Sequence, residues 1–298
     1  MPWQQITLTT SSDQSDMIAD LLHKNGALSV TFTDAKDEPL FQLQPEETPL
    51  WKHTEIKALF EAQDNISSIM QVISQEMLPH TFSYNSERLE DQDWVRKTQQ
   101  NFPAKQFANK LWVIPSWDDE KEHAGTIVKV DPGLAFGTGT HATTALCLEW
   151  LAKNPPLNES VIDYGCGSGI LSLAALALGA EKVYAIDHDP QALEATQNNA
   201  DLNAFPADAL EILTCQQAPN IQVPLVIANI LANPLLELKT TLQALTNSDA
   251  TLVLSGILAA EADRIVSAYS DAFELIEKAQ QEEWVRLVFK RSPQIKNA

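Results

Sequence analysis

The sequence predicts an α/β protein whose main domain is a mostly parallel sheet, preceded by a smaller α+β domain. Four apolar segments alternate with helical stretches after His141, at residues 161–164, 183–187, 225–228 and 251–254. Nearly continuous apolar strands separated by helices are typical of a parallel sheet covered on both faces. Residues 111–115 and 126–130 predict a short strand pair that leads into this domain. Two last strands, 273–279 and 284–290, are separated only by polar residues and predict a terminal antiparallel hairpin.

The first ninety residues alternate between strand and helix signals in a different order. Residues 4–8 alternate as a half-buried strand does, and Ser12 and Asp13 offer N-caps for a helix through Lys24. A strand, a strand, a helix and a strand are expected next, at residues 27–32, 55–60, 65–77 and 81–89. This β-α-β-β-α-β order is that of a ferredoxin-like unit. We therefore predict a small domain, a linker helix and the main domain, over residues 1–89, 90–105 and 106–298.

Composition excludes several classes of protein. Apolar residues make up 44% and charged residues 20% of the 298 residues, as in ordinary soluble globular proteins. No run approaches the roughly 18 apolar residues of a membrane helix, and the first residues lack the pattern of a signal peptide. We therefore expect a cytoplasmic protein with no membrane partner. The 3 cysteines are widely spaced and the 6 histidines lack metal-binding spacings, so neither disulfides nor a metal is expected.

The formal net charge is −20, with 40 acidic and 20 basic residues. Such acidity disfavours direct binding of nucleic acid, because that affinity depends on Lys and Arg neutralising phosphates. It favours a cationic partner instead. Acidity that only keeps the protein in solution explains the same composition, so both interpretations stay open.

The most informative segment, residues 161–171, is a buried strand that ends in Asp163 and leads through a glycine-rich turn into a helix. Glycine permits a tight turn and lets a ligand approach the backbone closely. In open α/β sheets, ligands bind beyond the carboxyl ends of the strands, where this loop lies. Gly165 and Gly167 fit a dinucleotide fingerprint, but its third glycine is replaced by Ile170. The pattern Asp-x-Gly-x-Gly-x-Gly instead resembles the first motif of class I S-adenosylmethionine methyltransferases.

Two further strands end in polar residues at the same edge of the sheet. Asp187 could accept hydrogen bonds from both ribose hydroxyls of a nucleoside. A helix cap is a less favoured role for it, because Asp189 already supplies the cap. As an exposed strand-end acid, Asp187 should contribute little to folding, and His188 beside it is expected to be a loop residue. Asn229 could orient an amine or the amino-acid part of the cofactor, or else bond only to its own turn.

Residues 131–144 form a fourth segment, with three glycines and a cluster of hydroxyl groups where a helix begins. Glycines favour mobility, and free backbone N–H groups at a helix N-terminus suit a carboxylate such as that of S-adenosylmethionine. We expect a flexible lid over the cofactor that includes Gly139 and Thr144. An inert loop is the alternative.

Together these segments resemble one family, the methyltransferases of large-subunit ribosomal protein eleven. The matching segments are residues 131–141, 163–169, 229–232, 255–258 and 282–284. The likeness extends over essentially the whole chain, although Ala142 stands where a proline is common and the N-terminal half matches less sharply. It implies a Rossmann-like class I methyltransferase domain. It also implies S-adenosylmethionine as the cofactor, bound by Thr144, Gly165, Asp187 and Asn229.

Gly139, Gly167 and Asp163, from the neighbouring loops, complete the predicted cofactor site, and no catalytic residue is assigned. By the same resemblance, the substrate is a ribosomal protein methylated on its N-terminal α-amine and on lysine ε-amines. The small domain would bind this protein and swing on residues 90–100.

Three other functions stay open. The first is methyl transfer to another acceptor, although residues 229–232 lack the Asn-Pro-Pro-Tyr pattern expected for amides and bases. The second is nicotinamide-dependent oxidoreduction, which Ile170 and the terminal hairpin disfavour. The third is non-catalytic binding of S-adenosylmethionine, which only a turnover measurement distinguishes.

Overall fold

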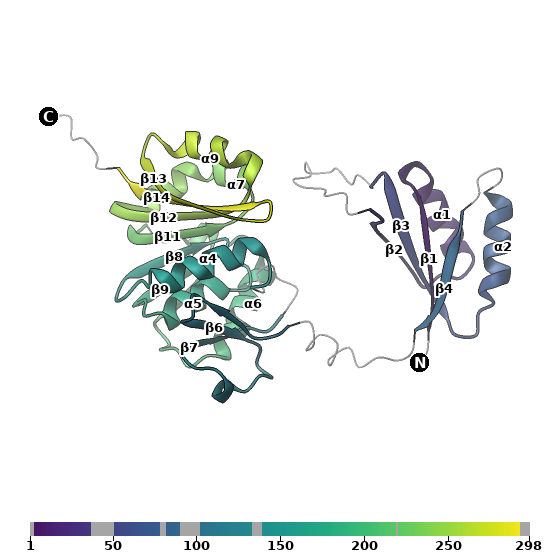
Figure 1. Cartoon of the computed structure of the whole chain (residues 1–298), viewed down its shortest axis with the longest axis horizontal. Helices are drawn as coiled ribbons and strands as arrows, with labels where there is room; N and C mark the ends of the chain where they lie inside the picture. Colours follow the sequence, from purple (N-terminus) through teal and green to yellow (C-terminus); the bar gives the residue numbers. More distant parts are fainter. Residues whose placement is uncertain are drawn as a thin grey trace. The chain divides into compact units, whose positions relative to one another are not determined.

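The computed structural model describes residues 3–36, 51–77, 82–89, 102–132, 139–218 and 220–292. The chain divides into two compact units, Met1–Thr98 and Gln99–Ala298 (Figure 1). This division falls inside the predicted linker, most of which lies outside the described residues. The helical character of residues 90–101 and the three domain boundaries therefore stay predictions. At residues 102–105 the predicted helix is wrong, because residues 102–104 form neither helix nor strand and Lys105 begins β5 (Lys105–Phe107).

The first unit is an antiparallel sheet with two helices packed on one face (Figure 1). Its elements are β1 (Trp3–Ser11), α1 (Ser12–Lys24), β2 (Ser29–Asp34), β3 (His53–Glu61), α2 (Ile66–Glu76) and β4 (Tyr84–Leu89). The strand order β2-β3-β1-β4 confirms the ferredoxin-like arrangement. Alternate residues of β1 and β3, such as Ile6 and Ile56, are buried under Ile18 of α1 and Met70 of α2.

One detail of the predicted first helix is wrong. The N-cap of α1 is Ser11, rather than Ser12 or Asp13, and its side chain makes no capping hydrogen bond. The reason is that β1 stays paired with β3 as far as Ser11, opposite His53. The chain therefore passes directly from strand to helix.

The second unit contains the remaining elements. They are β5 (Lys105–Phe107), β6 (Leu111–Ile114), η1 (Glu120–Glu122), β7 (Thr126–Lys129), α4 (Ala142–Lys153), β8 (Ser160–Tyr164), α5 (Ile170–Ala177), β9 (Lys182–Asp187), α6 (Pro190–Asp201), β10 (Leu210–Thr214), η2 (Cys215–Gln217), β11 (Val223–Asn229), α7 (Ala232–Glu237), α8 (Lys239–Leu245), β12 (Thr246–Leu258), η3 (Ala259–Glu261), α9 (Ala262–Tyr269), β13 (Phe273–Gln281) and β14 (Trp284–Arg291).

Seven strands form the central sheet, in the order β10-β9-β8-β11-β12-β14-β13. Strands β8 to β12 pair in parallel, whereas β14 pairs antiparallel with both β12 and β13. The predicted parallel sheet with a terminal antiparallel hairpin is confirmed. Strand β10 was not expected, because it is a half-buried edge strand without a continuous apolar run. The predicted strand pair before this sheet is β6 and β7, which β5 extends into a small separate sheet.

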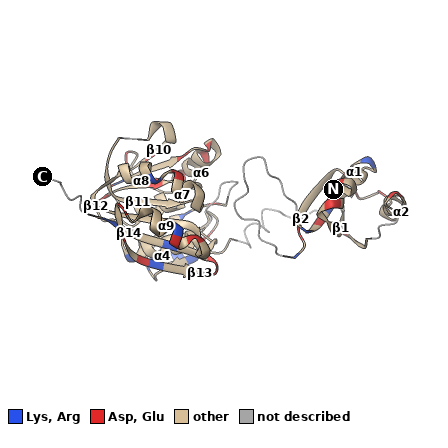
Figure 2. Ribbon diagram, turned by 90° about the horizontal axis from the view of Figure 1, so that it is seen from above, with Lys and Arg blue, Asp and Glu red and all other residues tan. Residues whose placement is uncertain are grey.

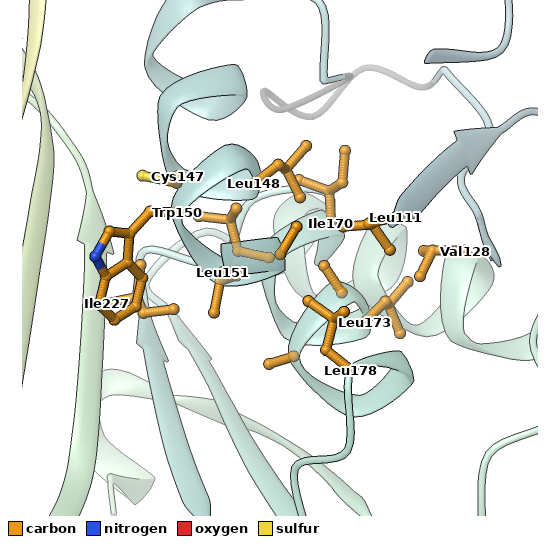
Figure 3. Close-up of a cluster of buried hydrophobic side chains, with 14 of the residues drawn as sticks. Leu111, Val128, Cys147, Leu148, Trp150, Leu151, Ile170, Leu173, Leu178 and Ile227 are labelled. Carbon is orange, nitrogen blue, oxygen red and sulfur yellow. The ribbon is translucent and has the colours of Figure 1, made fainter. Parts of the chain in front are cut away.

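Two apolar clusters hold the helices against the two faces of the central sheet. On one face, Leu148 and Leu151 of α4 pack with Leu173 of α5 and with Leu111 and Val128 of the small sheet (Figure 3). Residues of α7, α8 and α9 fill the other face. Fully burying one such aliphatic side chain contributes roughly 1.5–3 kcal/mol, so these clusters fix the strand ends with respect to one another.

Acidic and basic side chains are spread over both units (Figure 2). None of the helices in the described residues is long and apolar enough to cross a membrane. The three cysteines, Cys147, Cys166 and Cys215, are free.

Candidate active site

A cavity of about 690 Å³ opens at the carboxyl ends of the parallel strands. Its walls come from the residues that follow β8, β9, β10 and β11, from the start of α4 and from the start of β14. The predicted site residues on its surface are Thr144, Gly165, Gly167, Asp187 and Asn229. The sheet therefore brings together side chains from segments that lie far apart in the sequence.

Asp187, at the end of β9, is held by backbone donors. Its Oδ1 accepts hydrogen bonds from the N–H groups of His188 at 2.7 Å and Asp189 at 3.0 Å. Its Oδ2 accepts one from the N–H of Gly167 at 3.0 Å. A carboxylate offers about four acceptor sites, so these bonds leave capacity on Oδ2 for a ligand hydroxyl.

The structure corrects the expectation that Asp187 is an exposed acid with little part in folding. Its exposed fraction is only 7%, and its three backbone hydrogen bonds join the end of β9 to the glycine-rich loop. The expected cap of the next helix is confirmed, since the side chain of Asp189 accepts a hydrogen bond from Gln191 N.

The glycine-rich loop passes close to its neighbours. Gly165 has a φ of 80°, and a Cβ atom at this position would lie 2.4 Å from Cγ2 of Ile230. The N–H groups of Gly165 and Cys166 both donate to the carbonyl oxygen of Ile186, at 2.7 and 3.1 Å. The fold alone therefore requires a glycine at position 165, whether or not this residue contacts a ligand.

Asp163 and Gly139 lie behind the cavity rather than on its surface. Asp163, 1% exposed, accepts a hydrogen bond from Ser172 Oγ at 2.7 Å, whereas its Oδ1 is buried and accepts none from the described residues. Burial raises the pKa of Asp163 to about 6. At Gly139, a Cβ atom would lie 3.0 Å from Cδ1 of Ile170. Cofactor contact stays a prediction for both residues.

Asn229 and Thr144 meet across the cavity wall. The Asn229 Nδ2 donates to Thr144 Oγ1 at 3.3 Å, which links the end of β11 to the first turn of α4. Thr144 is fully buried. The Asn229 Oδ1 is buried and has no donor among the described residues. A buried carbonyl oxygen without a donor is costly, and a ligand N–H would satisfy it.

Several cavity residues were not selected from the sequence. His141 caps α4 by accepting a hydrogen bond from Thr143 N, and its ring lies edge-on to Trp284 at 5.1 Å. Both residues fall in the segments that carried the family resemblance, which was the signal that could have identified them. Tyr164 and Cys215 also line the cavity, without a recognisable motif. Burial raises the pKa of Tyr164 to about 12.

His188 is a further cavity residue that the sequence did not indicate. It is a loop residue, as expected, but it lies on the cavity surface and its Nδ1 is 3.3 Å from Asp187 Oδ1. Part of the expected lid segment, residues 133–138, lies outside the described residues, so its mobility stays a prediction. Among the residues that the structure does describe, no group of three or more His, Cys, Asp or Glu side chains could hold a metal ion.

The order of the seven strands and the cavity beside the glycine-rich loop define a class I methyltransferase fold. The crystal structure of ribosomal protein L11 methylase from Lactobacillus delbrueckii subsp. bulgaricus is similar, with a TM-score of 0.57 and 32% identity. That match covers 64% of this chain and 99% of the other.

Sequence comparison is more specific. Residues 2–292 match the family described as ribosomal protein L11 methyltransferase (PrmA). The proteins of that name from Aliivibrio salmonicida and Vibrio parahaemolyticus are 45% and 46% identical to this chain. Each of these matches covers 96% of this chain and 98% of the relative. The chain belongs to the ribosomal protein L11 methyltransferase family.

Proposed function

We propose that this protein transfers methyl groups from S-adenosylmethionine to the N-terminal α-amine and to lysine ε-amines of ribosomal protein L11. The observation that carries the proposal is the cavity that Asp187 and Asn229 share at the ends of β9 and β11, in a chain of this family. Its polar groups suit the two ends of that cofactor, a ribose and an amino acid.

The residues present fit S-adenosylmethionine. Asp187 Oδ2 has acceptor capacity for the ribose hydroxyls, and Gly165 and Gly167 let the ligand approach the loop backbone. The buried Asn229 Oδ1 would accept a hydrogen bond from the ammonium group of the amino-acid part. Thr144 fixes the amide of Asn229 in the orientation that presents this oxygen. Apolar side chains such as Ile170 and Leu231 complete the walls.

When bound, the cofactor supplies a methyl group on a positively charged sulfur. To accept it, the substrate amine would have to be neutral and lie in line with the methyl group, and the proton released on methylation would pass to water. The task of the protein is to hold the amine and the methyl group in line, and such orientation supplies roughly 7–11 kcal/mol of the barrier.

Deprotonation ranks the two kinds of target. At pH 7 an α-amine with a pKa of about 7.7–8.0 costs about 1 kcal/mol to neutralise, whereas a lysine with a pKa of about 10.4 costs about 4.6 kcal/mol. We expect the α-amine to react faster and the rate at lysine to rise more steeply with pH. Equal rates with flat pH profiles would contradict this ranking.

The substrate and the compartment complete the proposal. A protein with a net charge of −20 suits a basic partner such as a ribosomal protein, and the first unit is the part we propose to bind it. We place the reaction in the cytoplasm, where ribosomal proteins are made, which agrees with three free cysteines.

The test is incubation of the pure protein with radiolabelled S-adenosylmethionine and free ribosomal protein L11, followed by mass spectrometry of the acceptor. We expect mass gains in steps of one methylene group, located on the N-terminus and on lysines. If no mass is gained but calorimetry still shows binding of S-adenosylmethionine, the proposed acceptor is refuted and the proposed cofactor is retained. Absence of binding would refute both.

A further inference from the structure

Helix α6 carries a buried polar face next to the glycine-rich loop. Thr196 and Asn199 lie on this face with exposed fractions of 0% and 5%. A buried amide or hydroxyl group is costly unless its hydrogen bonds are made. The positions of these bonds therefore indicate what the polar face does.

Two loop carbonyl groups point at this face. Thr196 Oγ1 donates to the carbonyl oxygen of Gly167 at 3.0 Å, and Asn199 Nδ2 donates to that of Ser168 at 2.9 Å. The helix approaches closely, since a Cβ atom on Gly169 would lie 2.8 Å from Cγ2 of Thr196. A loop rich in glycine at positive φ has wide conformational freedom. These two bonds remove it by fixing successive peptide planes.

Asn199 makes a second connection that Thr196 does not. Its Oδ1 accepts a hydrogen bond at 2.9 Å from the N–H of Asp131, two residues after the end of β7. The carboxylate of Asp131 in turn accepts bonds from Ser116 N and Ser116 Oγ, both at 2.7 Å. A backbone donor on one side and a backbone acceptor on the other require a side chain that both accepts and donates. An ionised carboxylate of the same shape cannot donate.

We propose that Asn199 is a positioning residue for the cofactor: it locks the Gly167–Ser168 part of the loop to the chain at Asp131, and so holds the loop ready for binding. The effect reaches the ligand through Gly167, whose N–H donates to Asp187. This inference rests on the proposed use of S-adenosylmethionine, because it concerns the same cavity.

The neighbouring Asn203 provides a matched control. It lies just beyond the end of α6, where it accepts from Lys129 N and donates to Lys129 O, both at 2.9 Å, and so joins this end of the helix to β7. It also donates to the carbonyl oxygen of Asn199 at 2.7 Å, but no hydrogen bond joins its side chain to the loop. Loss of Asn203 therefore weakens the attachment of α6 without releasing the carbonyl groups of the loop.

The experiment compares Asn199→Ala, Asn199→Asp and Asn203→Ala with the unmodified protein. Affinity for S-adenosylhomocysteine, the unreactive product, is measured by calorimetry between pH 6 and 8, and stability by urea unfolding. We expect both alanine variants to lose stability, but only Asn199→Ala to lose affinity, by about tenfold. Asn199→Asp should bind nearly normally at pH 6, where a buried carboxyl is protonated and can donate to Ser168 O, and should lose affinity by pH 8.

The results distinguish a role of Asn199 in positioning the loop for the cofactor from a role in folding alone. Equal affinity in all variants, or an equal loss in Asn199→Ala and Asn203→Ala, would show that Asn199 only supports the fold. An Asn199→Asp affinity that follows the unmodified protein at every pH would also overturn the proposal, even if the alanine variant does not fold. Failure of the unmodified protein to bind would instead refute the proposed function itself.

Discussion

Asp187 at the end of β9 and Asn229 at the end of β11 line the same cavity, but their hydrogen bonding differs. The carboxylate of Asp187 already accepts three backbone N–H groups. The amide of Asn229 has one partner, Thr144, and its buried Oδ1 has no donor among the described residues. Strand β8 runs between these two strands and contains Asp163 near its end, and the Oδ1 of Asp163 is also buried with no donor from the part of the chain that the structure describes.

The difference suggests two ways of preparing a binding site. At β9 the carboxylate is built into the fold, so a ligand adds a hydrogen bond to a group that is already rigid. At β11 the free protein bears the cost of an unsatisfied oxygen, on the order of 1–3 kcal/mol, until a donor arrives. Substitutions on the β9 side should therefore affect folding and binding together, whereas those on the β11 side should affect binding alone.

The largest effect is expected for Asp187→Ala. The change removes an acceptor from three N–H groups and from the ribose, so we expect a loss of roughly 3 kcal/mol in unfolding free energy. S-adenosylhomocysteine affinity should fall by at least about a hundredfold, which is about 2.7 kcal/mol. Urea unfolding and calorimetry measure the two effects. Asp187→Asn, which retains one oxygen, should lie in between, and an unchanged dissociation constant would refute the placement of the ribose.

Asp163 gives the next largest effect, on stability and its pH dependence. Burial raises its pKa from 3.8 to about 6, so the folded protein holds this proton more tightly than the unfolded chain. The stabilisation is complete below pH 3.8 and is lost as the pH rises through 6, a change on the order of 3 kcal/mol. Asp163→Asn cannot titrate, so its stability relative to the unmodified protein should increase between pH 4 and 6. Urea unfolding measures this difference in unfolding free energy between the two proteins. A difference that stays constant over that pH range would show that the pKa of Asp163 is not raised.

A smaller effect is expected for Asn229→Ala, and on binding alone. We expect S-adenosylhomocysteine affinity to fall about thirtyfold, or roughly 2 kcal/mol, because the ammonium group of the ligand loses its acceptor. The unfolding free energy should not fall, since the change also removes a buried oxygen that no described residue satisfies. Turnover lost at unchanged affinity would mean that Asn229 faces the target amine rather than the cofactor.

The sequence predicted those site residues that belong to a local pattern in the chain. The end of an apolar strand marked Asp187 and Asn229, and glycine spacing marked the loop, because both signals are local in the chain. The sequence did not indicate that Asp187 is buried, because its three donors depend on how the loop and the following turn fold back on β9. The meeting of Asn229 with Thr144, 85 positions away, is a product of sheet topology.

In the fold, too, the features with a local sequence pattern were predictable and the others were not. The antiparallel hairpin was recognisable because two strands are joined by a few polar residues, whereas edge strand β10 lacked an apolar run. Asp163 was assigned to the cofactor from its motif, yet it lies behind the cavity, because the side chain at the end of a buried strand can point into the core. His141 and Trp284 also line the cavity, although in the sequence their segments indicate only the family resemblance.

The smallest effect is expected for Thr144→Val, which keeps the shape of the side chain and removes its hydroxyl group. Asn229 Nδ2 then loses its acceptor, and the amide is no longer held with Oδ1 toward the ligand. We expect S-adenosylhomocysteine affinity to fall about fivefold, roughly 1 kcal/mol, as for the loss of one neutral hydrogen bond. Thr144→Ser, which keeps the hydroxyl group, should bind within about twofold of the unmodified protein. If the serine variant binds as weakly as the valine variant, the methyl packing of this fully buried residue, rather than its hydroxyl group, prepares the β11 side.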